Sequence, residues 1–127
     1  MIDLFGMEQQ TPRTNDRPEA AALVEVLKAL RAHPAVSWVE RQKTGSARIG
    51  GRFVRFGWLG CSDVLGMLRD GRFLAVEVKA PKGTLRTEQA VFLERINGAG
   101  GVDFMARDLR DVRRELDFEK AGEKQND

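Results

Sequence analysis

Two apolar, β-rich segments joined by a short polar turn constrain the fold of this chain more than any other feature. Residues 61–68 and 72–79 are each long enough for a strand, and Arg69-Asp70-Gly71 between them is typical of a hairpin. An apolar hairpin of this kind needs other elements to cover it, because its apolar faces are unfavourable in water. The sequence therefore predicts a fold built around residues 61–79.

The loop of this hairpin can close in two ways, and each places the acidic side chains differently. A two-residue turn at Asp70-Gly71 pairs Asp63 with Val78, which puts Asp63 on the wrong face for a joint site with Glu77. A three-residue loop, with Gly71 in the left-handed conformation, puts Asp63 directly opposite Glu77. We predict the three-residue loop because it requires the glycine that stands there, and the two Cβ atoms then lie roughly 5 Å apart.

The segments on either side of the hairpin predict an α/β fold with a mixed central β-sheet flanked by helices. In residues 18–32, apolar side chains recur at helical spacing after Pro18, and Asp16 stands where an N-cap is expected. The other expected elements are a strand at 36–41, a glycine-bearing loop at 42–51, a strand at 52–58, a helix at 87–96, a strand at 101–107 and a helix capped by Asp108. The domain is expected to span 18–117, between a flexible arm at 1–17 and a disordered tail at 118–127.

Composition excludes some classes of protein, and the distribution of charge points to a class of partner. The single cysteine, Cys61, cannot form an internal disulfide, and no apolar run approaches the roughly 18–20 residues that span a membrane. We therefore expect a cytoplasmic protein.

The net charge is only +2, but the segment from Arg41 to Ser62 contains five basic residues and no acidic one. Such a segment is typical either of a polyphosphate-binding surface or of a solvated basic loop.

Glu77 and Lys79 stand two residues apart in the second strand of the hairpin, so their side chains share one face. An acid in an apolar strand is costly unless it is paired or bound to a metal. An ordinary ion pair explains these two residues taken alone. Asp63 opposite Glu77 changes the interpretation, because two carboxylates at that distance repel each other and a divalent cation removes the penalty.

Several pieces of the sequence, in this order and at these spacings, resemble the VRR-NUC family of the PD-(D/E)XK superfamily. They are Gly60-Cys61-Ser62-Asp63-Val64-Leu65-Gly66, Asp70-Gly71-Arg72-Phe73, Glu77-Val78-Lys79, Gln89 in the next helix, the later Gly100-Gly101-Val102, and the upstream Arg41 and Gly45. The resemblance covers about residues 19–116 and implies a restriction-endonuclease-like core. The chain departs from the family at Arg86-Thr87, where a small polar residue and a proline usually precede the helix.

The resemblance implies a role for each matching residue of the central hairpin. Asp63 and Glu77 would be carboxylate ligands of Mg²⁺ or Mn²⁺, with the backbone carbonyl of Val78 as a third ligand. Lys79 would orient the attacking water and offset negative charge in the transition state, and Gln89 would hold the water or the lysine. Hard oxygen ligands suit Mg²⁺ or Mn²⁺, whereas zinc prefers the His and Cys side chains that this chain almost lacks.

The family also uses a glutamate on the first helix as a further catalytic and metal-binding group. Glu19 is the match in this sequence, because it precedes Arg41 by a suitable distance. Glu25 is the competitor, and it could equally be a solvent-facing helix residue.

The function that the resemblance implies is metal-dependent hydrolysis of DNA phosphodiester bonds. Stand-alone members of the family act as homodimers on branched DNA, like Holliday junction resolvases, and many are encoded by phages or prophages. We therefore expect a structure-selective endonuclease and a homodimer, in a bacterial or phage-infected cell. The alternatives are a nuclease that acts on flap, nicked or duplex DNA, and a non-catalytic nucleic-acid-binding module of the same fold.

Basic residues near the expected site are the candidates for contact with DNA phosphates. These candidates are Arg41, Lys43, Arg52, Arg55 and Lys82. Trp38 and Trp58 fall on expected strands, and we predict that they pack in the core rather than stack on bases. His33, at a helix end before a proline, is predicted to be structural.

Overall fold

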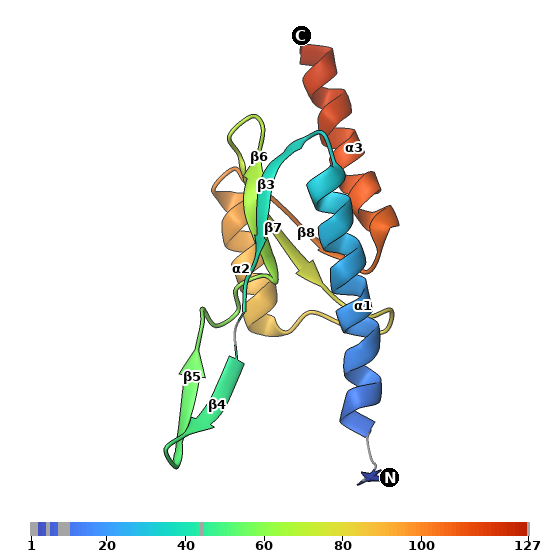
Figure 1. Cartoon of the computed structure of the whole chain (residues 1–127). Coiled ribbons are helices and arrows are strands. Elements are labelled where there is room, and N and C mark those ends of the chain that lie inside the picture. The colour runs from blue at the N-terminus through green and yellow to red at the C-terminus, as the bar shows by residue number, and fades with distance from the viewer. Residues whose placement is uncertain (1–2, 5, 8–10, 44, 127) are drawn as a thin grey trace.

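The computed structural model (Figure 1) describes the chain except for residues 1–2, 5, 8–10, 44 and 127, and its centre is a four-stranded sheet. The sheet contains, in spatial order, β3 (Val36–Arg41), β6 (Val64–Leu68), β7 (Phe73–Val78) and β8 (Val102–Ala106). The β6 strand pairs antiparallel with both β3 and β7, whereas β8 runs parallel to β7. The prediction of an α/β fold with a mixed sheet flanked by helices is confirmed.

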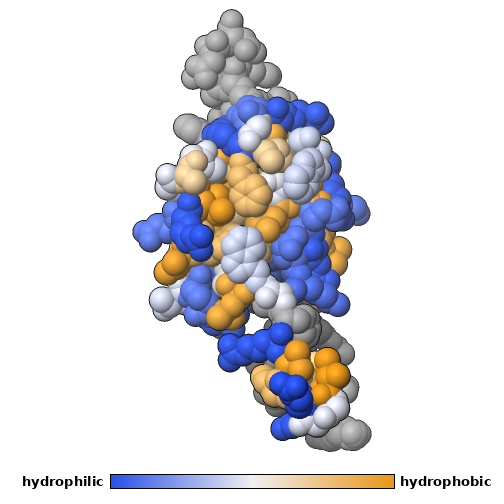
Figure 2. Space-filling view, turned by 90° about the vertical axis from the view of Figure 1, so that its left-hand side faces the viewer, coloured by the Kyte–Doolittle hydropathy of each residue, from blue (hydrophilic) through white to orange (hydrophobic). Residues whose placement is uncertain are grey.

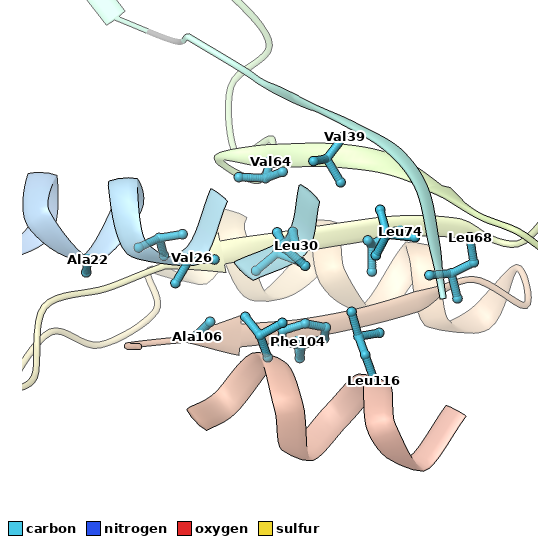
Figure 3. Packing of buried hydrophobic residues seen from close by; sticks show 14 residues of the cluster. Ala22, Val26, Leu30, Val39, Val64, Leu68, Leu74, Phe104, Ala106 and Leu116 are labelled. Atoms are coloured by element: carbon cyan, nitrogen blue, oxygen red, sulfur yellow. The ribbon is translucent and has the colours of Figure 1, made fainter. Parts of the chain in front are cut away.

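Helices cover both faces of this sheet, and the side chains of β7 alternate between the two layers. The helices α1 (Thr11–Ala32) and α3 (Leu109–Asn126) lie on one face, where α1 and α3 side chains pack on Leu74, Val76 and Val78 (Figure 3). The helix α2 (Thr87–Gly98) lies on the other face, where Phe92 and Leu93 pack on Ala75. Successive strand residues point to opposite faces, so Glu77 and Lys79 point to the α2 side.

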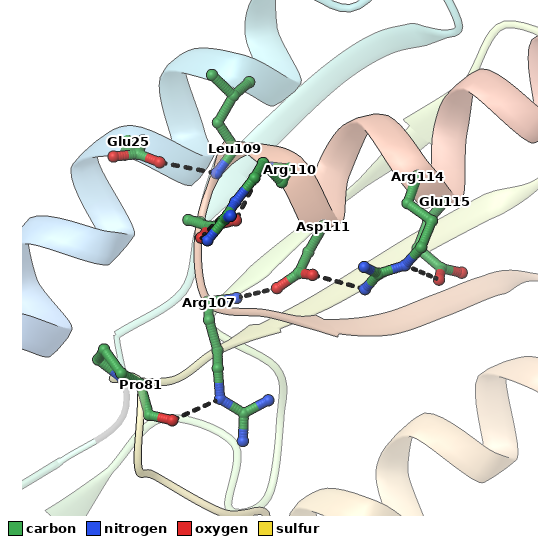
Figure 4. Close-up of polar contacts among 9 residues, drawn as sticks. Glu25, Pro81, Arg107, Leu109, Arg110, Asp111, Arg114 and Glu115 are labelled. Atoms are coloured by element: carbon green, nitrogen blue, oxygen red, sulfur yellow. Dashed lines mark hydrogen bonds and ion pairs between the residues drawn. The ribbon is translucent and has the colours of Figure 1, made fainter.

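Two polar contacts hold α1 against α3 and fix one face of the domain. The Glu25 carboxylate accepts a hydrogen bond of 2.8 Å from the backbone N–H of Leu109, at the first turn of α3 (Figure 4). Near the other end of α1, His33 Nδ1 accepts a bond from the N–H of Ala35, and Nε2 lies 2.7 Å from Asp117 Oδ1. An acceptor at Nδ1 leaves Nε2 as the donor. The prediction that His33 is structural is therefore confirmed.

Both terminal helices extend beyond the bounds that the sequence predicted. The α1 helix begins at Thr11, so Asp16 lies inside it and is not its N-cap, and part of the expected arm is helical. Pro12 stands in the first turn, where proline is favoured, and Pro18 removes only one backbone hydrogen bond from a long helix. The α3 helix continues to Asn126, where a disordered tail was expected, because residues 119–125 are mostly strong helix formers.

Two short strands, β1 (Asp3–Leu4) and β2 (Gly6–Met7), precede α1 and pair with each other. None of the helices among the described residues is long and apolar enough to cross a membrane.

A second hairpin lies where the sequence predicted a glycine-bearing loop followed by one strand. The β4 strand (Gly45–Ile49) pairs antiparallel with β5 (Arg52–Phe56), and neither joins the central sheet. Gly50 and Gly51 connect them with φ angles of 58° and 79°. Two successive residues with positive φ form the tight turn that matches the twist of a hairpin, and this glycine pair was the signal that the prediction missed.

Gly66 allows β3 to approach β6 closely enough for the sheet to form. A Cβ atom at this position would collide with the backbone carbonyl oxygen of Trp38 and with the side chain of Val39. The β3–β6 pairing contains an irregularity between Val36 and Trp38, next to this contact. The absence of a side chain at Gly66 therefore lets β3 lie close to β6, and this positions Arg41 opposite Val64.

We expect Gly66→Ala to lower the free energy of unfolding by about 1–3 kcal/mol, because an added methyl group here meets backbone rather than a movable side chain. Gly98→Ala is the matched control, since a Cβ at Gly98 meets nothing within 4 Å. Urea unfolding of both variants, followed by circular dichroism, measures the difference. Equal stability of the two variants would contradict the close approach of β3 to β6.

Candidate active site

The central hairpin closes with the three-residue loop that the sequence predicted. The register pairs Val64 with Val76 and Met67 with Phe73, so that Asp63 stands opposite Glu77. In the loop, Gly71 has a φ of 94° and donates its N–H to the Leu68 carbonyl. This register was the condition for a joint acidic site, and the prediction is confirmed.

The two carboxylates lie side by side, and each accepts a hydrogen bond from a backbone N–H of the opposite arm of the hairpin. The Val78 N–H donates a hydrogen bond of 2.8 Å to Asp63 Oδ2, and the Asp63 N–H donates one of 3.2 Å to Glu77 Oε1. These reciprocal bonds fix both side chains at the end of the hairpin away from its loop. One more polar group approaches them, since Lys79 Nζ lies 3.7 Å from Glu77 Oε2.

The environment of Glu77 makes its negative charge unfavourable in the protein without a metal. Its side chain is only 2% exposed. Burial first, and the charge of Asp63 second, raise the pKa of Glu77 to about 7, although the charge of Lys79 opposes the shift. A buried acid of this kind is stabilised by an added positive charge nearby.

Cys61 lies close to the acidic pair, and its thiol is held in the protonated form. It is buried against Ala75, Phe92 and Leu93. Burial, followed by the charges of Glu77 and Asp63, raises the pKa of Cys61 to about 11. A thiol is a much weaker nucleophile and metal ligand than a thiolate, so the chemistry of this site belongs to its oxygen atoms.

The oxygen atoms present suit a hard divalent cation. Asp63 and Glu77 supply carboxylates, and the Val78 carbonyl is the next backbone oxygen along β7. Glu19 is exposed on α1, and no three His, Cys, Asp or Glu side chains among the described residues converge on one point. Its competitor, Glu25, caps the first turn of α3 instead. The structure thus brings together the hairpin acids and does not bring the first-helix acid to them.

Gln89 is buried, and its side chain forms a hydrogen bond with the backbone at the start of α2. Its Oε1 accepts a hydrogen bond of 2.9 Å from the backbone N–H of Arg86. This is the glutamine half of a capping box, which replaces the small polar residue and proline expected at this point. The predicted contact between Gln89 and Lys79 remains a prediction.

A cleft of about 640 Å³ opens beside Asp63 and is rich in basic side chains. Its lining residues are Arg41, Gln42, Lys43, Phe53, Arg55, Leu59, Gly60, Cys61, Asp63, Arg86, Glu88 and Gln89. Of the predicted phosphate contacts, Arg41, Lys43 and Arg55 line it, whereas Arg52 and Lys82 do not. Arg86, Phe53 and Leu59 were missed by sequence reasoning. The alternation in β5 could have indicated Phe53, because it shares a strand face with Arg55.

The tryptophans depart from the prediction that they belong to the core. Trp38 is 49% exposed and Trp58 is 54% exposed. Trp58 packs edge to face on Phe92, with ring centroids 4.9 Å apart. It therefore covers the α2 side of the sheet at the surface and does not lie in the interior.

Arg107 fixes the loop between Lys79 and α2, a role that the sequence did not indicate. Its Nε donates to the Pro81 carbonyl at 3.1 Å, and its Nη2 donates to the Gly83 carbonyl at 2.7 Å. Its backbone N–H donates to Asp111 Oδ2 in the first turn of α3 (Figure 4). The end of β8 thus holds the loop that follows the acidic pair.

Comparisons of this chain with protein-family models, with curated proteins and with solved structures found no match. The functional interpretation therefore depends on the residues and on the geometry described above.

The raised pKa of Glu77 predicts how stability depends on pH. Because the folded protein holds this proton up to about pH 7 and the unfolded chain releases it near pH 4.5, stability falls as pH rises through this window. In the presence of EDTA, we expect Glu77→Gln to be more stable than wild type at pH 8, by on the order of 1–3 kcal/mol. Thermal unfolding from pH 5 to pH 8 measures the difference, which should shrink toward pH 5.

Glu94→Gln is the matched control, because Glu94 is exposed on α2, whereas the pKa of Glu77 is set by burial, Asp63 and Lys79. If the difference in stability between Glu77→Gln and wild type did not change with pH, the pKa of Glu77 would not be raised in the folded protein.

Proposed function

We propose that this chain is a metal-dependent nuclease that hydrolyses phosphodiester bonds in DNA. The observation that carries the proposal is the acidic pair, Asp63 with Glu77, beside Lys79 at the edge of a basic cleft. Hydrolysis of a phosphodiester requires activation of water and stabilisation of negative charge on the phosphate. The cleft supplies cations that attract the DNA backbone, and the hairpin supplies acids where the cleft meets the sheet.

The roles of the hairpin residues follow from their positions. Asp63 and Glu77, with the Val78 carbonyl, would hold Mg²⁺ or Mn²⁺. When bound, such an ion supplies Lewis-acid polarisation of the phosphate and lowers the pKa of a water molecule. Lys79 is the cation nearest to Glu77, and its ammonium group would orient the attacking water and offset charge that develops on the phosphate oxygens.

The arrangement of the elements supports the PD-(D/E)XK-like core that the sequence resemblance implies. Of the acids of the resemblance, Asp63 directly precedes β6 and Glu77 lies in β7, which pairs antiparallel with β6; Lys79 directly follows β7. The helix that carries Gln89 comes next, and the strand after it runs parallel to β7. Helix α1, with Glu19 near its middle, precedes the sheet.

We further propose that the enzyme selects branched DNA and acts as a homodimer, as the resemblance to Holliday junction resolvases implies. A symmetric dimer would present two acidic pairs to two strands of one junction. Arg41, Lys43 and Arg55 of the cleft form no ion pair with another residue that the structure describes, which supports a polyanionic substrate. The cleavage assay decides among junction, flap, nicked and duplex DNA.

Cleavage of labelled four-way junction, flap, nicked and linear duplex DNA tests the proposal, with Mg²⁺, Mn²⁺ or EDTA present. We expect metal-dependent cutting by wild type that EDTA abolishes. Asp63→Asn and Lys79→Met should each lower the cleavage rate by roughly 100-fold or more, because the first weakens the proposed metal site and the second removes the cation that would offset charge on the phosphate. Asn has the same shape as Asp, and Met is an unbranched side chain close in length to Lys, so the fold should persist in both variants.

Glu94→Gln, an exposed change on α2, is the control and should cut like wild type. Cutting confined to flaps or duplex would retain the nuclease and exclude the resolvase. DNA binding without cutting in either metal would overturn the enzyme and favour the non-catalytic binding module.

A further inference from the structure

The hairpin of β4 and β5 projects from the body of the molecule and exposes both of its faces. Its strands pair only with each other, and Figure 1 places it beyond the end of the central sheet. In Figure 2, hydrophobic and hydrophilic side chains lie next to one another on the segment that projects from the lower end of the body. A small exposed hairpin has no core of its own, so its surface side chains are available for a partner.

The register of this hairpin divides its side chains into two chemically different faces. Residues directly opposite in an antiparallel pair share a face, and Arg48 stands opposite Phe53. Arg55 lies two residues after Phe53 and so joins them. Phe53 and Arg55 both line the cleft beside Asp63, which identifies this as the cleft-side face. Ile49 and Arg52 form a pair on the opposite face.

The cleft-side face and the adjoining residues 41–43 carry positive charge that nothing in the described part of the chain neutralises. Arg41, Lys43, Arg48 and Arg55 are exposed and form no ion pair with another described residue. By contrast, Arg86 in the same cleft lies 3.3 Å from Glu88. Unpaired cations gathered along a cleft favour a polyanion, and their effect weakens as salt rises.

Phe53 stands among these cations with its side chain 65% exposed. An exposed aromatic ring is unfavourable in water, and it gains a stacking partner when an unpaired base lies on it. In an intact duplex the base faces are already covered by their neighbours. An aromatic ring flanked by arginines therefore fits a single strand better than it fits a duplex.

We propose that the cleft-side face of the β4–β5 hairpin binds an unpaired stretch of the DNA substrate, with a base stacked on Phe53. Arg48 and Arg55 contact the phosphates on either side, and Arg41 and Lys43 continue the path toward Asp63. This inference rests on the proposed nuclease function and defines its substrate more narrowly. The scissile phosphate lies beside a single-stranded segment, as in a flap or an open branch, and plain duplex binds less well.

Binding of fluorescently labelled DNA to the full-length protein, measured by anisotropy in EDTA, tests this without cleavage. A single-stranded oligonucleotide is compared with the duplex of the same sequence. We expect Phe53→Ala to weaken single-strand binding by roughly tenfold, in line with the loss of one stacked base, and to change duplex binding little. Phe53→Leu should weaken single-strand binding by as much as Phe53→Ala, because leucine offers no ring. Phe53→Trp keeps an aromatic ring and should bind single strands like wild type.

Ile49→Ala is the matched control on the opposite face of the same hairpin, because Ile49 is 60% exposed and lies outside the cleft. It should bind both DNAs like wild type. Equal losses in Phe53→Ala and Ile49→Ala, or equal losses on single strand and duplex, would overturn the inference. If single-strand binding depends on Phe53 but wild type cuts nothing in Mg²⁺ or Mn²⁺, the single-strand binding role of the hairpin holds and the proposed catalysis fails.

Discussion

The register of the β6–β7 hairpin is the constraint on which the rest of the site depends. Because side chains alternate along a strand, a shift of one residue would send Asp63 to the α1 side of the sheet while Glu77 stayed on the α2 side. Gly71 prevents that shift by closing a three-residue loop at a φ of 94°. Two hydrogen bonds then hold the register at the other end of the hairpin, one from the Asp63 N–H to the Glu77 carboxylate and one from the Val78 N–H to the Asp63 carboxylate.

The fold buries the carboxylate of Glu77 beside that of Asp63, where a negative charge is unfavourable, and the surrounding residues offset that free-energy cost only in part. Glu77 is buried in a strand that apolar side chains cover on both faces, and Lys79 at 3.7 Å offsets only part of the burial and repulsion. A site whose only purpose was stability would have replaced one carboxylate with an amide or an apolar group. The arrangement is understandable if a cation completes it, which is why the acidic pair, rather than the basic cleft, carries the proposed function.

The sequence predicted most elements that local signals specify, although the Gly50-Gly51 turn of the β4–β5 hairpin was overlooked, and it could not predict what tertiary contacts decide. Gly71 requires a left-handed conformation, so the hairpin and its register could be derived before the structure was known. The start of α1 could not, because Pro18 resembles a first-turn proline although the helix begins earlier, at Thr11. Glu25 and Arg107 have partners on α3 and on a distant loop, and no spacing along the chain indicates such contacts.

Two contacts anchor the ends of the segment that carries the β4–β5 hairpin, one beside the central sheet and one at the first turn of α2. Gln42 donates its N–H to the Asp63 carbonyl at 2.7 Å, and Gly60 lies so close to the Glu88 backbone that a Cβ would not fit there. The segment between these anchors can therefore change in length and composition while the acidic pair keeps its geometry. Insertions, deletions or a hairpin exchanged from another protein would change the proposed DNA contacts without rebuilding the acidic pair, so evolution and protein engineering can vary the two parts separately.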